Sequence, residues 1–225
     1  MFYDPTFILL IPAVLLAIYA QWKVSSTFKK YAKVGCSRGY TGAQVARYIL
    51  DDYRLQSIAV EPVRGELTDH YDPRSRKLRL SESVYGSNSV AAIGVAAHEA
   101  GHAIQDAKAY VPLKLRNGLV PVTNLGTTLA FPLFFIGMFA SLPQLMDFGI
   151  ILFALAVIFS VITLPVEFNA SSRAIRVLAD GHFLTERELP QAKAVLNAAA
   201  LTYVASTAMA VLNLVRLLVL RNQRD

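Results

Sequence analysis

The 225-residue sequence contains one cysteine, one tryptophan and four histidines. A single cysteine cannot form an internal disulfide, and Cys36 lacks neighbouring metal ligands, which excludes a disulfide scaffold and a cysteine-based metal site. Charged residues make up only 17% of the chain, whereas hydrophobic residues make up 54%. This composition is too apolar for a soluble enzyme and indicates a membrane protein in contact with a lipid bilayer.

The formal net charge is +6, but the basic residues form no stripe interleaved with aromatic residues, so we expect no nucleic-acid partner. Their positions indicate membrane orientation instead. Four lysines, at positions 23, 29, 30 and 33, follow the first apolar segment, while residues 141–147 contain no lysine or arginine. The positive-inside rule therefore predicts that the hydrophilic region faces the cytoplasm.

Four apolar segments approach or exceed the length needed to cross a bilayer. They cover residues 7–20, 119–140, 148–166 and 194–220. We expect the first to be a retained anchor, and the second and third to form a helical hairpin. The fourth is either a crossing or a packed or re-entrant helix, because it contains several polar residues. These residues are Asn197, Thr202, Ser206, Asn213 and Arg216.

The most informative residues are His98, Glu99 and His102, which form an H-E-x-x-H pattern in a run of small apolar residues. The run predicts a helix from about Ser89 to Lys108, and histidines four residues apart on a helix project from one face. This spacing is typical of a zinc site, in which Glu99 acts as general base and acid on a zinc-activated water. In the alternative interpretation the histidines are core residues, but a carboxylate flanked by them would then be costly to desolvate.

A catalytic zinc needs a third protein ligand, with one position left for water. The candidates are His70, His182 and the carboxylates, and among these we favour Glu167. It directly follows the third apolar segment and begins an amphipathic run, where a carboxylate requires a reason. In the alternative interpretation Glu167 pairs with Arg173 or Arg176 at the membrane surface.

The parity of the crossings supports Glu167. His98 and His102 precede the predicted hairpin at 119–166, and Glu167 follows it. Two crossings return the chain to the same side of the membrane. The three ligands can therefore meet at the cytoplasmic membrane surface.

The hydrophilic region contains a helix and a small sheet. Residues 41–50 have helical apolar spacing and begin with a Thr-x-x-Gln capping box. Residues 57–63, 66–71 and 77–81 are predicted strands, with a proline-containing turn before the last. A strand before the zinc helix could hold an extended peptide at its free edge through main-chain hydrogen bonds. Residues 70–72 either line this edge or merely end a strand and start a turn.

Three stretches carry a family resemblance: residues 67–73, residues 94–105 around the histidines, and residues 164–168. Together with the N-terminal span, they resemble the YugP-like family of bacterial membrane zinc metallopeptidases. The resemblance implies a gluzincin-like site with one Zn²⁺ per chain. The implied residues are the zinc ligands His98, His102 and Glu167 and the catalytic acid and base Glu99.

One position departs from a related pattern. In the similar HtpX-type and CAAX-processing membrane proteases, an aspartate four residues after the ligand glutamate orients a ligand histidine. Here that position is Ser171, which can accept a hydrogen bond from an imidazole but brings no charge. We therefore expect weaker support of the histidine, or support from Asn169 or another residue.

The expected fold is a mainly α membrane protein with about four transmembrane or membrane-embedded helices and a small α+β zincin-like metallopeptidase region. Its parts are an N-terminal anchor (1–22), a hydrophilic region with the sheet and zinc helix (23–118), a transmembrane hairpin (119–166), a ligand helix and loop (167–193), and a C-terminal apolar helix with a basic tail (194–225).

The expected function is that of a membrane-anchored zinc endopeptidase that hydrolyses polypeptides at the membrane surface. A catalytically silent, zinc-stabilised scaffold or chaperone that binds unfolded chains is the alternative, and the intact Glu99 argues against it. An intramembrane protease would require the zinc histidines inside an apolar span, but both histidines lie outside the four apolar segments.

Overall fold

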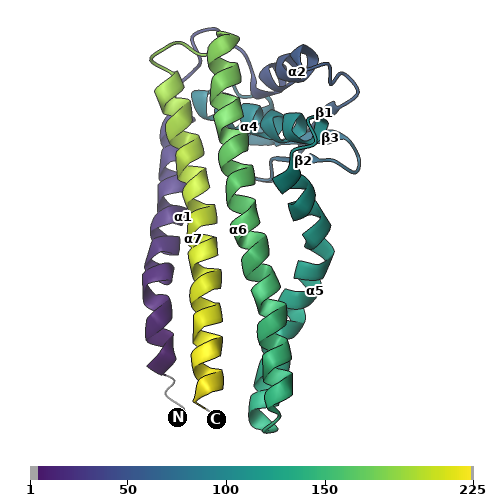
Figure 1. The fold of residues 1–225 in the computed structure, drawn as a ribbon. Helices are drawn as coiled ribbons and strands as arrows, with labels where there is room; N and C mark the ends of the chain where they lie inside the picture. The colour runs from purple at the N-terminus through teal and green to yellow at the C-terminus, as the bar shows by residue number, and fades with distance from the viewer. Residues whose placement is uncertain (1–4, 224–225) are drawn as a thin grey trace. The chain divides into compact units, whose positions relative to one another are not determined.

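The computed structural model describes residues 5–223 of the chain, which divides into two compact units. Among the described residues, the first unit comprises residues 5–21, 114–165 and 201–223, and the second comprises residues 22–113 and 166–200. The described chain has four long helices (Figure 1). Each of them contributes residues to both units. They are α1 (Ile11–Tyr31), α5 (Val111–Phe139), α6 (Pro143–Asp180) and α7 (Leu189–Asn222).

Each of these helices is long and apolar enough to cross a membrane, where α1 is counted together with the short 3-10 helix η1 (Pro5–Leu10) before it. The predicted fold class of a mainly α membrane protein with about four such helices is confirmed. The helices are longer than the predicted spans. Helix α5 continues through Pro121 and Pro132, and α6 continues through Pro165. An apolar environment favours this continuity, because a backbone that leaves the helix there finds no water to replace its hydrogen bonds.

Helices α5 and α6 pack closely within the first unit. Ala130, Phe134, Met146 and Phe153 form its buried core. A Cβ at Gly149 of α6 would lie 2.7 Å from the carbonyl oxygen of Ala130 in α5. The glycine therefore permits the close contact between the two arms of the predicted hairpin.

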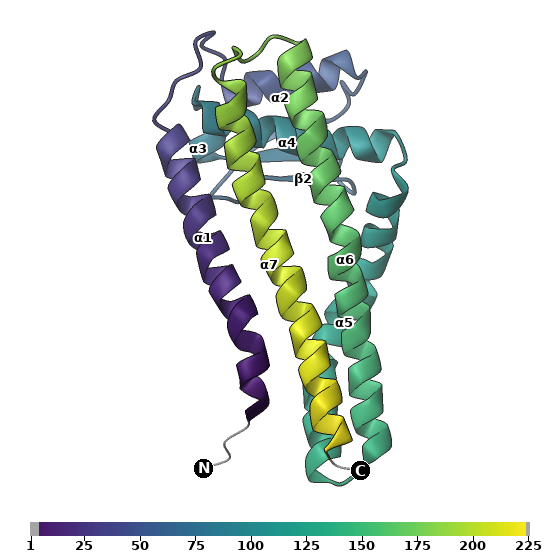
Figure 2. The same cartoon turned by 60° about the vertical axis from the view of Figure 1, so that its left-hand side comes forward.

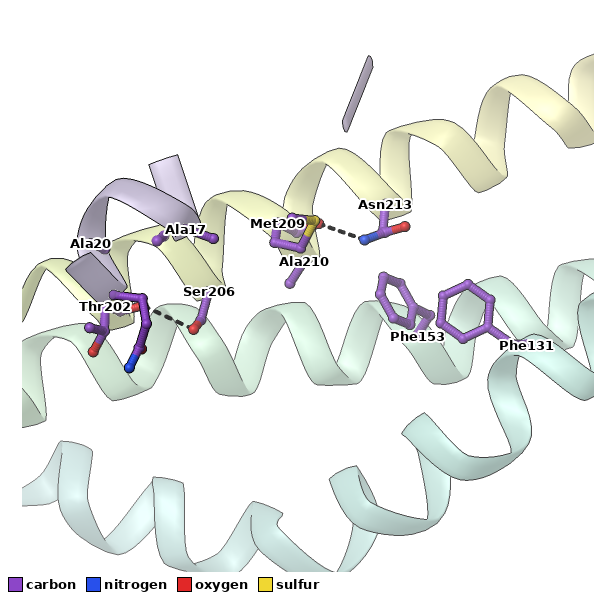
Figure 3. Close-up of a pocket in the computed structure, with 11 residues that line it drawn as sticks. Ala17, Ala20, Phe131, Phe153, Thr202, Ser206, Met209, Ala210 and Asn213 are labelled. Atoms are coloured by element: carbon purple, nitrogen blue, oxygen red, sulfur yellow. Dashed lines mark hydrogen bonds between the residues drawn. The ribbon is translucent and has the colours of Figure 1, made fainter. Parts of the chain in front are cut away.

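Two polar side chains of α7 donate hydrogen bonds to the backbone of the same helix. Ser206 Oγ donates to the Thr202 carbonyl at 2.9 Å, and Asn213 Nδ2 donates to the Met209 carbonyl at 3.0 Å. These residues line a cavity of about 430 Å³ in the first unit (Figure 3). A helix that satisfies its own polar side chains in this way can cross a bilayer at lower cost.

Two arginines near the end of α7 also have partners within the first unit. The guanidinium of Arg216 donates from Nε to Thr6 Oγ1 at 3.1 Å and lies 3.9 Å from the ring centre of Phe7. Arg221 Nε lies 2.8 Å from Oδ1 of Asp147. These contacts bring the start of the described chain, the first turns of α6 and the end of α7 together.

The second unit contains a three-stranded sheet in the order β1-β3-β2. Strand β1 (Ala59–Val63) is parallel to β3 (Lys77–Ser81), and β2 (His70–Asp72) is antiparallel to β3. The predicted hairpin before residue 77 is therefore confirmed. The predicted second strand, 66–71, was too long at its start, because Leu67 adopts a left-handed φ of 57°.

Three further helices complete this unit: α2 (Gly42–Asp52), α3 (Glu82–Tyr85) and α4 (Val90–Ala107) (Figure 2). The capping box predicted for α2 is present, with Thr41 N–H donating to the Gln44 side chain at 2.9 Å. Helix α2 packs on α4 and buries Val45 and Ile49 in the core. The core therefore encloses α4, the helix that carries the two histidines.

Candidate metal centre

Helix α4 is shaped by its small residues. The hydroxyl of Ser89 accepts the backbone N–H of Ala92 at 3.2 Å and so caps the first turn. Gly101, which lies between the two histidines, faces the backbone of α6. A Cβ at Gly101 would lie 2.8 Å from the carbonyl oxygen of Ala170. Glycine at this position therefore lets α6 bring Glu167 close to the histidines.

The three predicted metal ligands converge. Glu167 Oε2 lies 3.3 Å from His98 Nε2 and 3.6 Å from His102 Nε2. The ligand atoms of all three residues lie within 4.8 Å of one another. Zinc binds nitrogen and oxygen at about 2.0–2.2 Å, so neighbouring ligands of a tetrahedral site lie roughly 3.3–3.5 Å apart. The two distances from Glu167 are close to this spacing, so the three residues could hold a zinc ion.

The other nitrogen of each imidazole also has a partner. His98 Nδ1 lies 3.1 Å from Ser171 Oγ, and His102 Nδ1 lies 3.0 Å from Gln105 Oε1. The Gln105 amide nitrogen donates to two oxygens of α6, so the oxygen that faces His102 can only accept. His102 must then carry its proton on Nδ1. Its Nε2 lone pair is therefore free to bind a metal.

The buried Gln105 side chain links α4 to α6. Its Nε2 donates to the Val166 carbonyl at 2.8 Å and to Asn169 Oδ1 at 3.0 Å. Asn169 Oδ1 also accepts a hydrogen bond from Arg173 Nε at 2.6 Å. A chain of polar groups from α6 thus ends at His102. Sequence reasoning does not single out Gln105, although its position three residues after His102 on the same helix face is a usable signal.

Glu99 is buried beside the ligands, and its Oε2 accepts the backbone N–H of Tyr71 at 3.1 Å. Burial raises the pKa of Glu99 to about 7, and the neighbouring His98 opposes this shift. The positive charge of a bound cation would also oppose this rise, because it stabilises the carboxylate. A carboxyl group with a pKa in this range can both take up and release a proton near neutral pH.

Comparison with known proteins identifies the family of the chain. The chain matches the family described as "Putative neutral zinc metallopeptidase" over residues 6–222. The chain belongs to this family. It is also similar to the "Putative membrane protease YugP" of Bacillus subtilis (strain 168), with 49% identity over 218 residues, which is 96% of this chain and 97% of that protein. No solved structure gives a significant match. The resemblance predicted from three stretches of sequence is confirmed.

In this member of the zinc metallopeptidase family, the cluster of possible metal ligands found among residues 5–223 consists of His98, His102 and Glu167. The other candidate histidines lie outside it. His70 is exposed, and its Nδ1 lies 2.7 Å from the Thr68 carbonyl oxygen. His182 is exposed in the turn after α6, with a left-handed φ of 52°.

Ser171 and Asn169, the residues that the sequence offered as hydrogen-bonding partners of the histidines, make different contacts. Ser171 contacts His98 directly, without bringing a charge. Asn169 supports the other histidine indirectly, through Gln105. Arg173, which the sequence offered as an alternative partner of Glu167, donates to Asn169. Its guanidinium therefore belongs to the network behind His102.

Proposed function

We propose that the chain is a membrane-anchored, zinc-dependent endopeptidase that binds one Zn²⁺ through His98, His102 and Glu167. The observation that carries the proposal is the convergence of these three ligand atoms within 4.8 Å of one another. Glu99, on the same helix as the histidines, is available for proton transfer. Membership of a zinc metallopeptidase family supports the same reaction class.

Hydrolysis in this proposal depends on one carboxyl group. A bound zinc ion would supply Lewis-acid activation of water and of the scissile carbonyl. Glu99 takes a proton from water as the water oxygen attacks the carbonyl carbon. When the C–N bond breaks, Glu99 passes that proton to the departing amine nitrogen. The N–H of Tyr71 holds the Glu99 carboxylate in place for both transfers.

Strand β2 offers a binding surface for an extended peptide. It is an edge strand, because β3 is its single neighbour in the sheet. The N–H of Tyr71 points away from β3 and towards Glu99, so the open side of β2 faces the catalytic carboxylate. Main-chain hydrogen bonds to this side would bind polypeptides with little regard to their sequence.

We infer that the active site faces the bacterial cytoplasm. Lys29 and Lys30 lie in the last turn of α1, as expected of a helix end on the positive side of the membrane. Four crossings would place the end of α7 on the opposite side, where Arg221 would break the charge bias. The pairing of Arg221 with Asp147 reduces that conflict and supports α7 as a crossing.

Zinc analysis and cleavage of an unfolded test protein, with the protein purified in detergent, test the proposal. Wild type should bind one zinc ion per chain and cleave the substrate. Glu99→Gln should keep the zinc and lose about 10²- to 10⁴-fold in rate, the usual contribution of a general base. His98→Ala should lose the zinc. Glu186→Gln, which alters an exposed glutamate of the same unit, should behave as wild type.

The same measurements separate the alternative function. Wild type that binds zinc but cleaves no unfolded protein would overturn the peptidase proposal and favour a zinc-stabilised scaffold. Cleavage that persists unchanged in Glu99→Gln would contradict the role given to this carboxylate.

A further inference from the structure

Tyr71 contacts helix α4 at two points. Its backbone N–H donates to Glu99 Oε2 at 3.1 Å, and its hydroxyl donates to Asp106 Oδ2 at 2.9 Å. Glu99 and Asp106 are seven residues apart, which is about two helical turns, so they lie on the same side of α4. One residue of the edge strand is therefore tied to the zinc helix through both its backbone and its side chain.

The position of Asp106 is unfavourable for the helix itself. It lies in the last turn of α4, where the helix dipole disfavours a negative charge. The hydrogen bond from Tyr71 gives this carboxylate a partner. Burial raises the pKa of the Tyr71 phenol, and the hydrogen bond to Asp106 raises it further. The hydroxyl therefore keeps its proton and remains a donor.

Hydrogen bonds of Asp69, just before β2, and of Asp72, at its end, reach β3 and the turn that follows β2. Asp69 accepts the N–H of Ser81 at 2.7 Å, at the end of β3. Asp72 accepts the N–H of Arg74 at 2.9 Å within the turn that follows β2. None of these contacts sets the distance between β2 and α4. Among the hydrogen bonds described for residues 69–72, those of Tyr71 reach the zinc helix.

We propose that Tyr71 and Asp106 form a clamp that sets the distance between edge strand β2 and the carboxylate of Glu99. Tyr71 is then a positioning residue for peptide hydrolysis, and this part of the inference rests on the proposed function. Its hydroxyl bonds to Asp106, which is not a metal ligand. Loss of the clamp should misplace Glu99 and the peptide-binding edge and leave zinc binding intact.

Three substitutions test the clamp by kinetics. Tyr71→Phe removes the donor, Asp106→Ala removes the acceptor, and Asp106→Asn keeps an acceptor oxygen. We expect kcat to fall roughly 10- to 100-fold in the first two, because small misplacements of catalytic groups have effects of this size. Asp106→Asn should retain most of the activity, and the double variant Tyr71→Phe with Asp106→Ala should be no slower than the slower single variant. Tyr85→Phe, which alters a tyrosine packed against the same core, is the matched control and should be unchanged.

Hydrogen–deuterium exchange tests the clamp without reference to cleavage. In zinc-loaded protein, the amides of residues 70–72 should exchange faster in Tyr71→Phe and Asp106→Ala than in wild type and Tyr85→Phe. Faster exchange in a chain that never cleaves would support the clamp while the proposed function fails. Unchanged exchange overturns the clamp. Unchanged cleavage, or a loss of cleavage that follows a loss of zinc, overturns the positioning role.

Discussion

Replacing Gln105 by leucine should weaken zinc binding although Gln105 is not a metal ligand. Its Oε1 accepts the proton on His102 Nδ1, and its amide nitrogen donates to Val166 and Asn169 on α6. Leucine keeps a similar volume at this fully buried position but removes every one of these hydrogen bonds. The ring of His102 then loses the contact that fixes both its orientation and its protonated nitrogen.

The size of the effect follows from which groups lose their partners. Asn169 keeps its hydrogen bond with Arg173, so the N–H of His102 is the group most exposed to the loss. A buried donor without an acceptor costs about 1–3 kcal/mol. Removal of the outer partner of a metal-bound histidine typically lowers metal affinity about 10- to 100-fold. That range corresponds to about 1.4–2.8 kcal/mol in binding free energy.

Titration of zinc against a competing chelator measures this change directly. Gln191→Leu is the matched control, because the buried Oε1 of Gln191 has no hydrogen-bond partner among the described residues. We expect zinc affinity to fall in Gln105→Leu and to stay at the wild-type value in Gln191→Leu. Equal zinc affinity in Gln105→Leu and wild type would refute the role assigned to the Gln105 network.

Two further predictions concern the stability of the second unit. Gly101→Ala should lower the free energy of unfolding by about 1–3 kcal/mol in thermal unfolding, because the added Cβ would press on the α6 backbone. The control Gly94→Ala, whose Cβ would make only ordinary contacts, should be neutral or stabilising. Equal effects of the two substitutions would contradict the close approach of α4 and α6 at Gly101. Burial of Glu188 opposes its ionisation, but hydrogen bonds from Ser37 and Thr185 outweigh this and lower its pKa from 4.5 to about 2. The ionised carboxylate therefore stabilises the fold fully above pH 4.5, and the melting temperature of Glu188→Gln should lie below that of wild type at pH 7. The difference between the two melting temperatures should shrink as the pH falls from 4.5 towards 2. A difference that stays constant with pH would contradict this role of Glu188.

Local sequence patterns predict the elements around the site well. The zinc helix predicted from Ser89 to Lys108 is observed as Val90–Ala107. Ser89 is its N-cap residue and Lys108 is its C-cap residue. The third strand is observed at its predicted bounds, 77–81. These features depend on residues a few positions apart, such as a capping hydroxyl or alternating side chains. A single sequence contains all the information that they require.

Features that depend on distant contacts are not predictable in the same way. The parallel pairing of β1 with β3 requires a crossover whose register no local pattern specifies. Helix α6 continues through Pro165 to Asp180, beyond the predicted span of 148–166. This continuity depends on the environment of the helix, which the local sequence does not specify. The bond from Gln105 to Asn169 joins residues 64 positions apart. The sequence therefore indicates which residues can bind zinc, whereas the groups that orient them emerge only from the folded chain.

Glu167, the proposed third ligand, is far from the histidines in sequence, and contacts between α6 and α4 hold it near them. Glu167 follows a predicted membrane hairpin, yet it belongs to the same compact unit as the histidines, because α6 changes unit at Pro165. Two contacts with α4 hold this part of α6: the approach of Ala170 to Gly101 and the hydrogen bonds made by Gln105. The position of Glu167 therefore depends on packing within the second unit. Gly101, inside the H-E-A-G-H motif, is therefore as necessary to the proposed metal centre as the histidines beside it.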